Sequence, residues 1–474
     1  MGSILDNCQI KEKCQKFTPN EIVKTMLDMA GYTRNLFGQT ILENSFGSGN
    51  ILTEIVRRYI LDGLTNQLDN DTISRGLSED IFGIELDENL YLECITKLNE
   101  ILREYNIPDT KWNFFCTDTL RWNAPLKFDY VIGNPPYVTY SDIDLDSRNF
   151  IKQKYISCKN GKFDYCYAFI ESGINCLSEH GKLVQLIPSN IYKNVFGNDL
   201  RKILLQHLCE IKEYPNYNMF KDTLTSNSIF LFNNGYDLEQ IAYENVTKGI
   251  KLNISKKILN DKWVFMPKKS QETQLVRFGD RFHASITVAT LLNEAFIIGE
   301  DAYNRSVIEP EILKKTTSPR NMRFNKKEFI IFPYYFDDDG KIQHYSVESF
   351  ERLFPLTVKY LRKFKEKLDN RNKDKSAQWF EYGRSQAICH QNQEKLLMST
   401  VVTNKVEIYM LDSDIVPFSG IYIITNDKRY SLSDAEKILR SNDFLQYVQN
   451  IGISVSGNSK RITCNDINNY EFKE

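Results

Sequence analysis

The segment FDYVIGNPPY, residues 128–137, decides the fold of the first half of the chain. Its first part, residues 128–132, is apolar and aromatic and predicts a short buried strand that a glycine stops. The two prolines that follow fix φ and lack an N–H, and each disfavours the α conformation in the residue before it. The carbonyl groups around Asn134 and Pro135 therefore stay outside any helix, next to the ring of Tyr137.

This turn carries the groups that would hold a flat ring with an exocyclic amine. The side-chain oxygen of Asn134 and the carbonyl oxygen of Pro135 are two fixed acceptors for the two hydrogens of an NH2 group. Holding both hydrogens would draw the nitrogen lone pair out of the ring and aim it at an electrophile, while Tyr137 could stack on the ring. An ordinary Asn-Pro turn explains the same residues equally well, so the rest of the chain must decide.

Three strands are predicted upstream, at residues 40–43, 81–87 and 112–116, with helices between them. The residues at or just after their carboxyl ends are Glu43, Gly47, Gly49, Glu85 and Asp118. Ligands bind at the carboxyl ends of the strands in open α/β sheets, and an acid after the second strand can accept the hydroxyls of a ribose. A third glycine of the dinucleotide fingerprint is replaced by Leu52, so this turn does not support an NAD-type site.

Two further expectations concern the helices of this region. Thr18 is expected to cap the first helix, which Pro19 begins and Gly31 ends. Residues 61–80 are polar and lack periodicity, so they are expected to form a surface insertion.

The composition limits the classes of protein to which this chain can belong. The 474 residues are 42% hydrophobic and carry a formal net charge of −2, which predicts a globular protein of two or more domains without a global basic field. The ten cysteines form no Cys-x-x-Cys pair and no histidine stands at metal-ligand spacing, so no metal site is expected. No apolar run has the length of a signal peptide core or a membrane span, so a bacterial cytoplasmic location is expected.

The character of the sequence changes near residue 240. Residues 1–240 are predicted to form an α/β domain with a mostly parallel, doubly wound sheet, and residues 241–474 a mixed α+β domain. The second half contains a basic run, residues 359–375, followed by aromatic residues mixed with arginine and amides. Such a run is usually a solvated face, but here it is also the best local footprint for a phosphate backbone. The basic residues of the second half that are candidates for contacting such a backbone are Lys363, Lys367, Arg384, Lys460 and Arg461.

With these motifs in this order, the chain resembles the S-adenosylmethionine-dependent DNA adenine-N6 methyltransferases of restriction–modification systems. The most similar group is the γ arrangement of the TaqI and Eco57I type, in which cofactor and catalytic motifs precede the target-recognition domain. The resemblance implies a Rossmann-like methyltransferase domain in residues 1–240 and a TaqI-like specificity domain in residues 241–474. The first-strand motif departs from the common pattern, with Asn44 and Phe46 where Pro and Cys are frequent.

The resemblance also implies a role for each matching residue. The loop that holds the target adenine, with a second aromatic beside the flipped base, would consist of Asn134, Pro135, Pro136, Tyr137 and Phe220. The residues around S-adenosylmethionine would be Thr18, Pro19, Glu43, Gly47, Gly49, Glu85, Leu86, Asp118 and Asn134. Within that set, Glu85 would hold the ribose, Leu86 would pack on the adenine of the cofactor and Asp118 would bind its amine.

The implied activity is methyl transfer to the N6 of an adenine flipped out of a short duplex DNA sequence, which protects DNA from a cognate restriction enzyme. The expected partners are double-stranded DNA and a separately encoded endonuclease, and the protein is expected to be a monomer that binds no membrane. The same loop also serves DNA cytosine-N4, RNA adenine and protein glutamine methyltransferases, which remain alternatives. A non-enzymatic alternative is a DNA-binding specificity subunit with an inactive catalytic fold.

Overall fold

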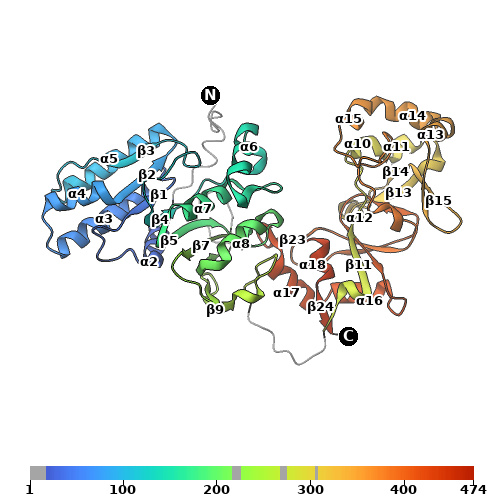
Figure 1. Ribbon diagram of the computed structural model, residues 1–474. Helices are drawn as coiled ribbons and strands as arrows, with labels where there is room; N and C mark the ends of the chain where they lie inside the picture. Colours follow the sequence, from blue (N-terminus) through green and yellow to red (C-terminus); the bar gives the residue numbers. More distant parts are fainter. Residues whose placement is uncertain (1–17, 216–225, 267–274, 305–307, 474) are drawn as a thin grey trace. The chain divides into compact units, whose positions relative to one another are not determined.

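The computed structural model describes residues 18–215, 226–266, 275–304 and 308–473 (Figure 1). The chain divides into two compact units, residues 1–269 and residues 270–474. Each unit has its own sheets, and the first unit contains two hydrophobic core clusters and the second unit one large cluster. Among the helices in the described part of the chain, none is long and apolar enough to cross a membrane.

A nine-stranded sheet forms the centre of the first unit, with the strand order β3-β2-β1-β4-β5-β7-β6-β8-β9. Its strands are β1 (Ile41–Glu43), β2 (Ile81–Glu85), β3 (Asn113–Cys116), β4 (Phe128–Gly133), β5 (Leu177–Pro188), β6 (Leu208–Tyr214), β7 (Asn227–Asn233), β8 (Gln240–Asn245) and β9 (Ile250–Ser255). The first five strands in this order are parallel, whereas β7 is antiparallel to both of its neighbours. The predicted mostly parallel α/β sheet is confirmed.

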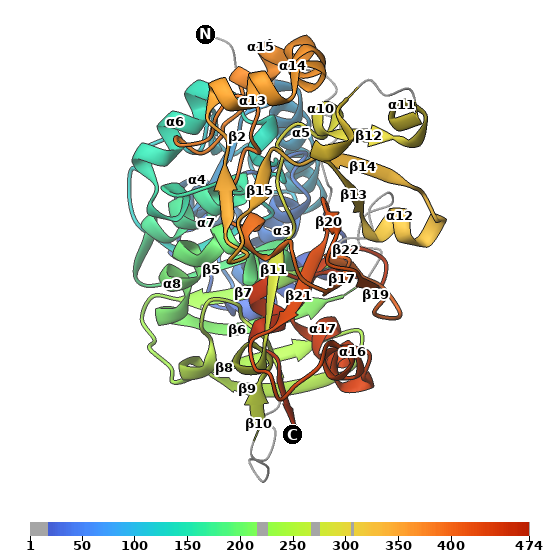
Figure 2. The same ribbon diagram turned by 90° about the vertical axis from the view of Figure 1, so that its right-hand side faces the viewer.

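Helices cover both faces of this sheet (Figures 1 and 2). They are α2 (Asn20–Ala30), α3 (Asn50–Thr65), α4 (Asn70–Asp80), α5 (Glu88–Glu104), α6 (Leu145–Lys154), α7 (Tyr165–Asn175) and α8 (Asn198–His207). Helices α2 to α5 pack into one core and α6 to α8 into another. Successive side chains of a strand point to opposite faces, and accordingly Val131 of β4 belongs to one core and Ile132 to the other.

Two local expectations were wrong. The first helix is capped by Pro19 without a side-chain hydrogen bond, because the hydroxyl of Thr18 interacts elsewhere. Residues 61–80 are not an insertion: α3 continues to Thr65, and Asp69 caps α4 by accepting a hydrogen bond from Thr72 N at 2.7 Å. Helix α4 is polar overall and buries few side chains, which is why its periodicity is weak in the sequence.

The first unit ends later than the predicted boundary at residue 240. Strand β8 pairs in parallel with β6, and β9 pairs antiparallel with β8, so the sheet continues past that boundary. Trp263 lies beyond both strands, is buried, and stacks on Tyr192 at 5.8 Å between ring centroids. The compact unit therefore extends to Lys269 because residues 241–263 complete its core.

The second unit is mixed α+β, as predicted, with small sheets whose orders are β11-β21-β17-β19, β12-β14-β13-β20, β18-β23-β22, β10-β24 and β15-β16. Its strands are β10 (Leu275–Arg277), β11 (Phe282–Ile286), β12 (Ile297–Gly299), β13 (Leu313–Thr317), β14 (Glu328–Ile331), β15 (Tyr334–Phe336), β16 (Ile342–His344), β17 (Lys395–Met398), β18 (Val401–Val402), β19 (Ile408–Leu411), β20 (Ile415–Pro417), β21 (Ile421–Thr425), β22 (Ile453–Ser456), β23 (Ser459–Arg461) and β24 (Glu471–Lys473). Its helices are α9 (Phe278–Arg281), α10 (Asn293–Phe296), α11 (Glu300–Asn304), α12 (Pro319–Phe324), α13 (Val347–Leu353), α14 (Pro355–Leu361), α15 (Lys365–Asp369), α16 (Leu432–Leu439), α17 (Asn442–Ile451) and α18 (Cys464–Asn468).

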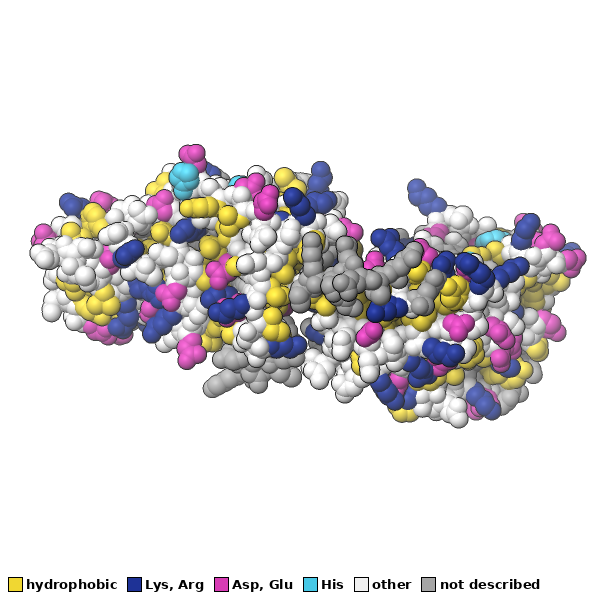
Figure 3. Space-filling view, turned by 90° about the horizontal axis from the view of Figure 1, so that it is seen from below, with side chains coloured by type: hydrophobic (Ala, Val, Ile, Leu, Met, Phe, Trp, Pro, Cys, Tyr) yellow, Lys and Arg dark blue, Asp and Glu magenta, His cyan; other side chains and the backbone are white. Residues whose placement is uncertain are grey.

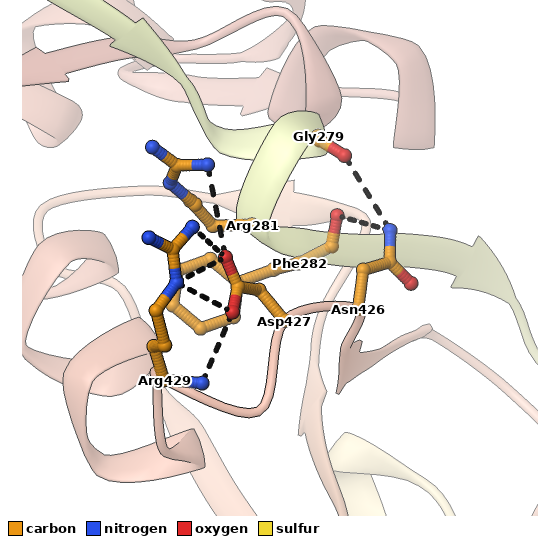
Figure 4. Close-up of polar contacts among 6 residues, drawn as sticks. All are labelled: Gly279, Arg281, Phe282, Asn426, Asp427 and Arg429. Atoms are coloured by element: carbon orange, nitrogen blue, oxygen red, sulfur yellow. Dashed lines mark hydrogen bonds and ion pairs between the residues drawn. The ribbon is translucent and has the colours of Figure 1, made fainter.

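A polar junction fastens the loop after β21 to the start of β11 (Figure 4). Asn426 Nδ2 donates to the carbonyl oxygen of Phe282 at 3.2 Å. The carboxylate of Asp427 accepts from Arg429 Nη2 at 2.6 Å and lies 3.7 Å from Arg281 Nη1. The hydrogen bonds from Arg429 lower the pKa of Asp427 to about 2. This junction joins two segments that are far apart in the sequence.

Candidate functional site

A pocket with about 1130 Å³ of empty space, part of it open to solvent, lies at the carboxyl ends of β1, β2 and β4. This is the point where the strand order reverses, and open α/β sheets bind ligands there. The pocket is lined by Thr18, Glu43, Ser45, Phe46, Gly47, Ser48, Asn50, Ile51, Ile84, Glu85, Leu86, Asp87, Leu90, Asp118, Thr119, Asn134, Pro135, Pro136, Tyr137, Val138, Tyr165 and Phe169. The tertiary structure thus brings the strand-end residues and the Asn-Pro-Pro-Tyr loop to one place.

The glycine turn after β1 forms one wall of the pocket. Gly47 and Gly49 have φ angles of 54° and 86°, which glycine adopts without the penalty of a side chain. A Cβ on Gly49 would collide with Cys94 Sγ of α5, whereas one on Gly47 would meet no atom within 4 Å. The turn is therefore packed against α5 on one side and open toward the pocket on the other.

Glu85, at the end of β2, is fixed by backbone N–H groups. Its Oε2 accepts from Gly47 N at 2.8 Å, and its Oε1 accepts from Leu86 N at 2.8 Å and Asp87 N at 2.9 Å. Burial raises the pKa of Glu85, and these three hydrogen bonds act in the opposite direction. The carboxylate is thus held in one orientation at the pocket wall.

Glu43, the last residue of β1, is the most deeply buried acid of the pocket. Its exposed fraction is only 2%, and burial raises its pKa well above the ordinary value of a glutamate. Within the described residues, its Oε2 has no hydrogen-bond partner. An unpartnered buried carboxylate oxygen is costly, and a donor or a cation in the pocket would remove that cost.

Asp118 lies after β3 on another wall of the pocket. Its Oδ1 accepts a hydrogen bond from Leu120 N at 2.9 Å, and its Oδ2 lies 3.3 Å from Arg121 Nε. Burial raises the pKa of Asp118, and the hydrogen bond from Leu120 opposes that effect. The carboxylate is therefore anchored locally while it lines the pocket.

Hydrogen bonds to neighbouring elements fix the Asn-Pro-Pro-Tyr loop. The carbonyl oxygen of Asn134 accepts from Ser45 Oγ at 3.2 Å, and Asn134 Nδ2 donates to Thr18 Oγ1 at 3.1 Å. Tyr137 donates its hydroxyl hydrogen to the carbonyl oxygen of Leu186 at 3.2 Å, and burial raises its pKa well above the ordinary value. The bond to Thr18 sets the orientation of the Asn134 amide, because it fixes which end of the amide carries the NH2 group.

The structure adds residues that the sequence did not single out. Tyr165 and Phe169 of α7 line the pocket, and their rings meet edge to face at 5.2 Å between centroids. Asn50 also lines it and donates from Nδ2 to the carbonyl oxygen of Thr18 at 3.3 Å. The spacing of four residues between the two aromatics places both on one helix face, and this is the signal that could have identified them. Phe220 lies outside the described residues.

The candidate DNA contacts of the second unit have partners within that unit. Lys363 lies over the ring of Tyr360 at 5.9 Å, and Lys367 Nζ is 2.7 Å from Glu294 Oε1. Arg384 Nη1 is 3.1 Å from Asp374 Oδ1. On the face of this unit shown in Figure 3, basic and acidic side chains are interspersed.

The other two candidates, Lys460 and Arg461, lie together on β23. Lys460 Nζ donates to Ser454 Oγ at 2.6 Å, and Arg461 pairs with Val401 and Ile453 on either side. The structure therefore brings these two residues together on one strand. Lys363 and Lys367 are neighbours on another segment of the same unit.

Comparisons with known proteins agree with this fold. Residues 53–220 match the family model of the Eco57I restriction-modification methylase. The chain is 31% identical to the type II methyltransferase M.BstVI of Geobacillus stearothermophilus over 40% of this chain and 36% of that protein. It is 24% identical to the type II restriction enzyme and methyltransferase RM.Eco57I of Escherichia coli over 69% of this chain and 38% of that protein.

Among solved structures, the type IIL restriction-modification enzyme MmeI, determined in complex with DNA, aligns with a TM-score of 0.61. That alignment has 14% sequence identity and covers 95% of this chain and 65% of MmeI. The chain thus spans little more than a third of the curated relatives described above and about two thirds of MmeI.

The fold and the pocket define the class as a Rossmann-like α/β domain joined to an additional mixed α+β unit, a fold that this chain shares with MmeI. Within that class, residues 53–220 are similar to the Eco57I-type methylases of restriction–modification systems. The resemblance seen in the sequence is therefore confirmed. The matched region includes Glu85, Asp118 and the Asn-Pro-Pro-Tyr loop, whereas Thr18 and the glycine turn precede it.

Proposed function

We propose that the protein is a site-specific DNA methyltransferase that transfers a methyl group from S-adenosylmethionine to the N6 amine of an adenine flipped out of duplex DNA. The single observation that carries this proposal is that one pocket joins the strand-end acids and Gly47 to the Asn-Pro-Pro-Tyr loop. The kinship with restriction–modification methylases and the DNA complex of MmeI support DNA as the substrate. Methylation would protect the DNA from a cognate restriction enzyme.

The residues at the strand ends fit the parts of S-adenosylmethionine. Glu85 would accept the ribose hydroxyls, with Leu86 against the adenine ring and Asp118 accepting from the adenine amine. Glu43 carries a buried oxygen without a partner among the described residues, which suits the cationic end of the cofactor. When bound, the cofactor supplies an electrophilic methyl group on a sulfonium.

The Asn-Pro-Pro-Tyr loop would hold the target amine. The side-chain oxygen of Asn134 and the carbonyl oxygen of Pro135 would accept the two hydrogens, which orients the nitrogen and localises its lone pair. Tyr137 would stack on the flipped base, a contact worth about 1–3 kcal/mol, and so offset part of the lost stacking and pairing. Its hydroxyl is held by Leu186, so the ring position is set before the base arrives.

Replacing Asn134 tests the assigned role of this residue. We expect Asn134→Ala to reduce methyl transfer to duplex DNA on the order of 10²–10³-fold, as the loss of one preorganised polar contact does at other active sites. Binding of S-adenosylmethionine, measured by calorimetry, should stay near the wild-type value because the acids and glycines of the pocket remain. A variant that loses cofactor binding to the same extent as transfer would show that the role is misassigned.

Methylation-aware sequencing of DNA from cells that express the protein tests the substrate. N6-methyladenine within one short sequence is the expected result. N4-methylcytosine at a short sequence would instead identify the cytosine enzyme, which uses the same loop. Labelled methyl groups that appear in RNA or protein and never in DNA would refute the proposed function.

A further inference from the structure

A segment of the first unit combines positive charge with a position beside the pocket. Residues 147–163 contain five basic residues and no acidic one, in a chain whose formal net charge is −2. The five are Arg148, Lys152, Lys154, Lys159 and Lys162. Helix α6 carries the first three, and the other two follow it (Figure 1).

These cations differ from the basic run of the second unit in their pairing. Within the part of the chain that the structure describes, none of the five has an ion pair within 4 Å. In the basic run, by contrast, Arg362 lies 3.0 Å from Glu351, Lys365 lies 2.8 Å from Asp369, and Lys367 pairs with Glu294. The positive charge of residues 147–163 is therefore available to an external anion.

Two of the cations contact the ring of Tyr140, three residues after the Asn-Pro-Pro-Tyr loop. The guanidinium carbon of Arg148 lies 4.7 Å from the centroid of the Tyr140 ring, and Lys152 Nζ lies 5.2 Å from it. A hydrogen bond from Lys152 lowers the pKa of the Tyr140 hydroxyl, and the charges of Arg148 and Lys162 act in the same direction. The Tyr140 ring therefore brings Arg148 and Lys152 close to one another.

The segment is attached to the pocket wall on two sides. Val138, which lines the pocket, accepts from Tyr165 N at 3.1 Å, and the ring of Tyr140 meets that of Phe163 at 5.3 Å. On the other side, Arg121 lies 4.0 Å from the ring centroid of Phe150.

Lys154 Nζ extends this second attachment by donating to the carbonyl oxygen of Leu120 at 2.7 Å, next to the Asp118 wall of the pocket. Residues 140–162 also contain three acids, Asp142, Asp144 and Asp146, which lie at or before the first turn of α6 and are outnumbered by the five basic residues. Asp144 caps the helix by accepting from Ser147 N at 2.9 Å, and Asp142 accepts from Thr139 Oγ1 at 2.6 Å. Both carboxylates accept hydrogen bonds at the amino-terminal end of the segment, whereas the five cations lie further along the chain.

From this arrangement we infer that residues 140–162 form a phosphate-binding surface that holds the DNA backbone next to the target base. The inference rests on the proposed function and adds to it a DNA contact made by the catalytic unit itself. Lysines act as point charges on flexible stems, and a spaced row of them fits a chain of phosphates. Such contacts position the duplex and carry no sequence information, so this surface should serve any recognition sequence.

The test measures how the affinity for a duplex of mixed sequence depends on salt. In the full chain, Lys152→Gln with Lys162→Gln removes two unpaired charges and leaves Arg148 and Lys154 in their contacts. The slope of log K against log salt should become less steep by about 1.8, at about 0.9 for each lost phosphate contact. Lys152→Arg with Lys162→Arg should keep the wild-type slope.

A matched control removes the same charge from paired cations of the same unit. Arg57 lies 3.1 Å from Glu104 and Lys251 lies 3.4 Å from Glu244, so Arg57→Gln with Lys251→Gln should leave the slope near wild type. Binding of S-adenosylmethionine should be unchanged in every variant. The inference would be overturned if the test and control variants had equal slopes. It would also be overturned if the test substitutions weakened binding to single-stranded RNA but not to duplex DNA. Failure of the wild-type protein to methylate any DNA would instead overturn the proposed function.

Discussion

The contact between Thr18 and Asn134 shows how a single hydroxyl can serve the reaction without touching the reacting atoms. Thr18 is buried, and its Oγ1 accepts from Asn134 Nδ2. An amide has a donor end and an acceptor end, so engaging the NH2 group fixes where the carbonyl oxygen points. In the proposed mechanism that oxygen accepts from the target amine, which makes Thr18 a positioning residue.

Substitution of Thr18 should therefore affect the rate more than binding. Thr18→Val keeps the shape of the side chain but removes the acceptor, and the loss of one hydrogen bond, about 1 kcal/mol, should slow single-turnover methyl transfer several-fold. The dissociation constant of the cofactor should change little. Thr18→Ser, which restores the acceptor, should restore the rate. If both variants were equally slow, packing of the methyl group would be the explanation.

Glu43 makes the stability of the protein depend on pH. Its pKa in the folded state is raised by burial, so the folded protein favours the protonated side chain. The stability contributed by this group is present below the ordinary pKa of about 4.3 and is lost as the pH rises through the folded value. Glu43→Gln, which stays neutral, should unfold at higher denaturant concentration than wild type at pH 8, and the difference should shrink at pH 5.

The control for this prediction is Glu21→Gln on the exposed face of α2. This substitution should shift the denaturant midpoint by the same small amount at pH 5 and at pH 8. A Glu43→Gln midpoint below that of wild type at pH 8 would mean that the folded protein favours the charged carboxylate.

At the scale of elements, strands β8 and β9 decide where the first unit ends. They extend the sheet beyond the region in which the predicted helices and strands alternate, and they bury Ile241, Tyr243 and Ile254. Trp263 then closes the same core and donates from its backbone N to the carbonyl oxygen of Tyr192 at 2.8 Å. These residues belong to the first unit although their sequence resembles that of the second.

Shortened chains test this boundary. A chain that ends at Lys269 should unfold cooperatively and bind S-adenosylmethionine, because it contains the whole sheet and the pocket. A chain that ends at Gln240 loses several buried side chains worth about 1.5–3 kcal/mol each, a large share of a total stability of about 5–15 kcal/mol. We expect it to melt at a much lower temperature or to aggregate. Equal melting temperatures for the two chains would contradict the boundary.

At the scale of the whole molecule, the near-zero net charge conceals local surfaces on which positive charge gathers. The formal net charge of −2 gives no overall attraction to a polyanion, so binding must depend on particular surfaces. The sequence drew attention to the basic run of residues 359–375, where charges are dense. The structure shows that several of those cations face carboxylates, whereas none of the sparser cations of residues 147–163 has an ion pair within 4 Å among the residues that the structure describes. The density of basic residues along the sequence does not show which of them form ion pairs in the folded protein.

The sequence by itself determined the alternation of strands and helices, the mostly parallel sheet and the residues at the strand ends. It could do so because strand burial, proline geometry and glycine conformations are local properties. Only the tertiary structure decided that Tyr165, Phe169 and Asn50 join the pocket, that Thr18 holds Asn134 instead of capping a helix, and that β8 and β9 close the first unit. These features are contacts between residues far apart in the chain, which no local pattern records.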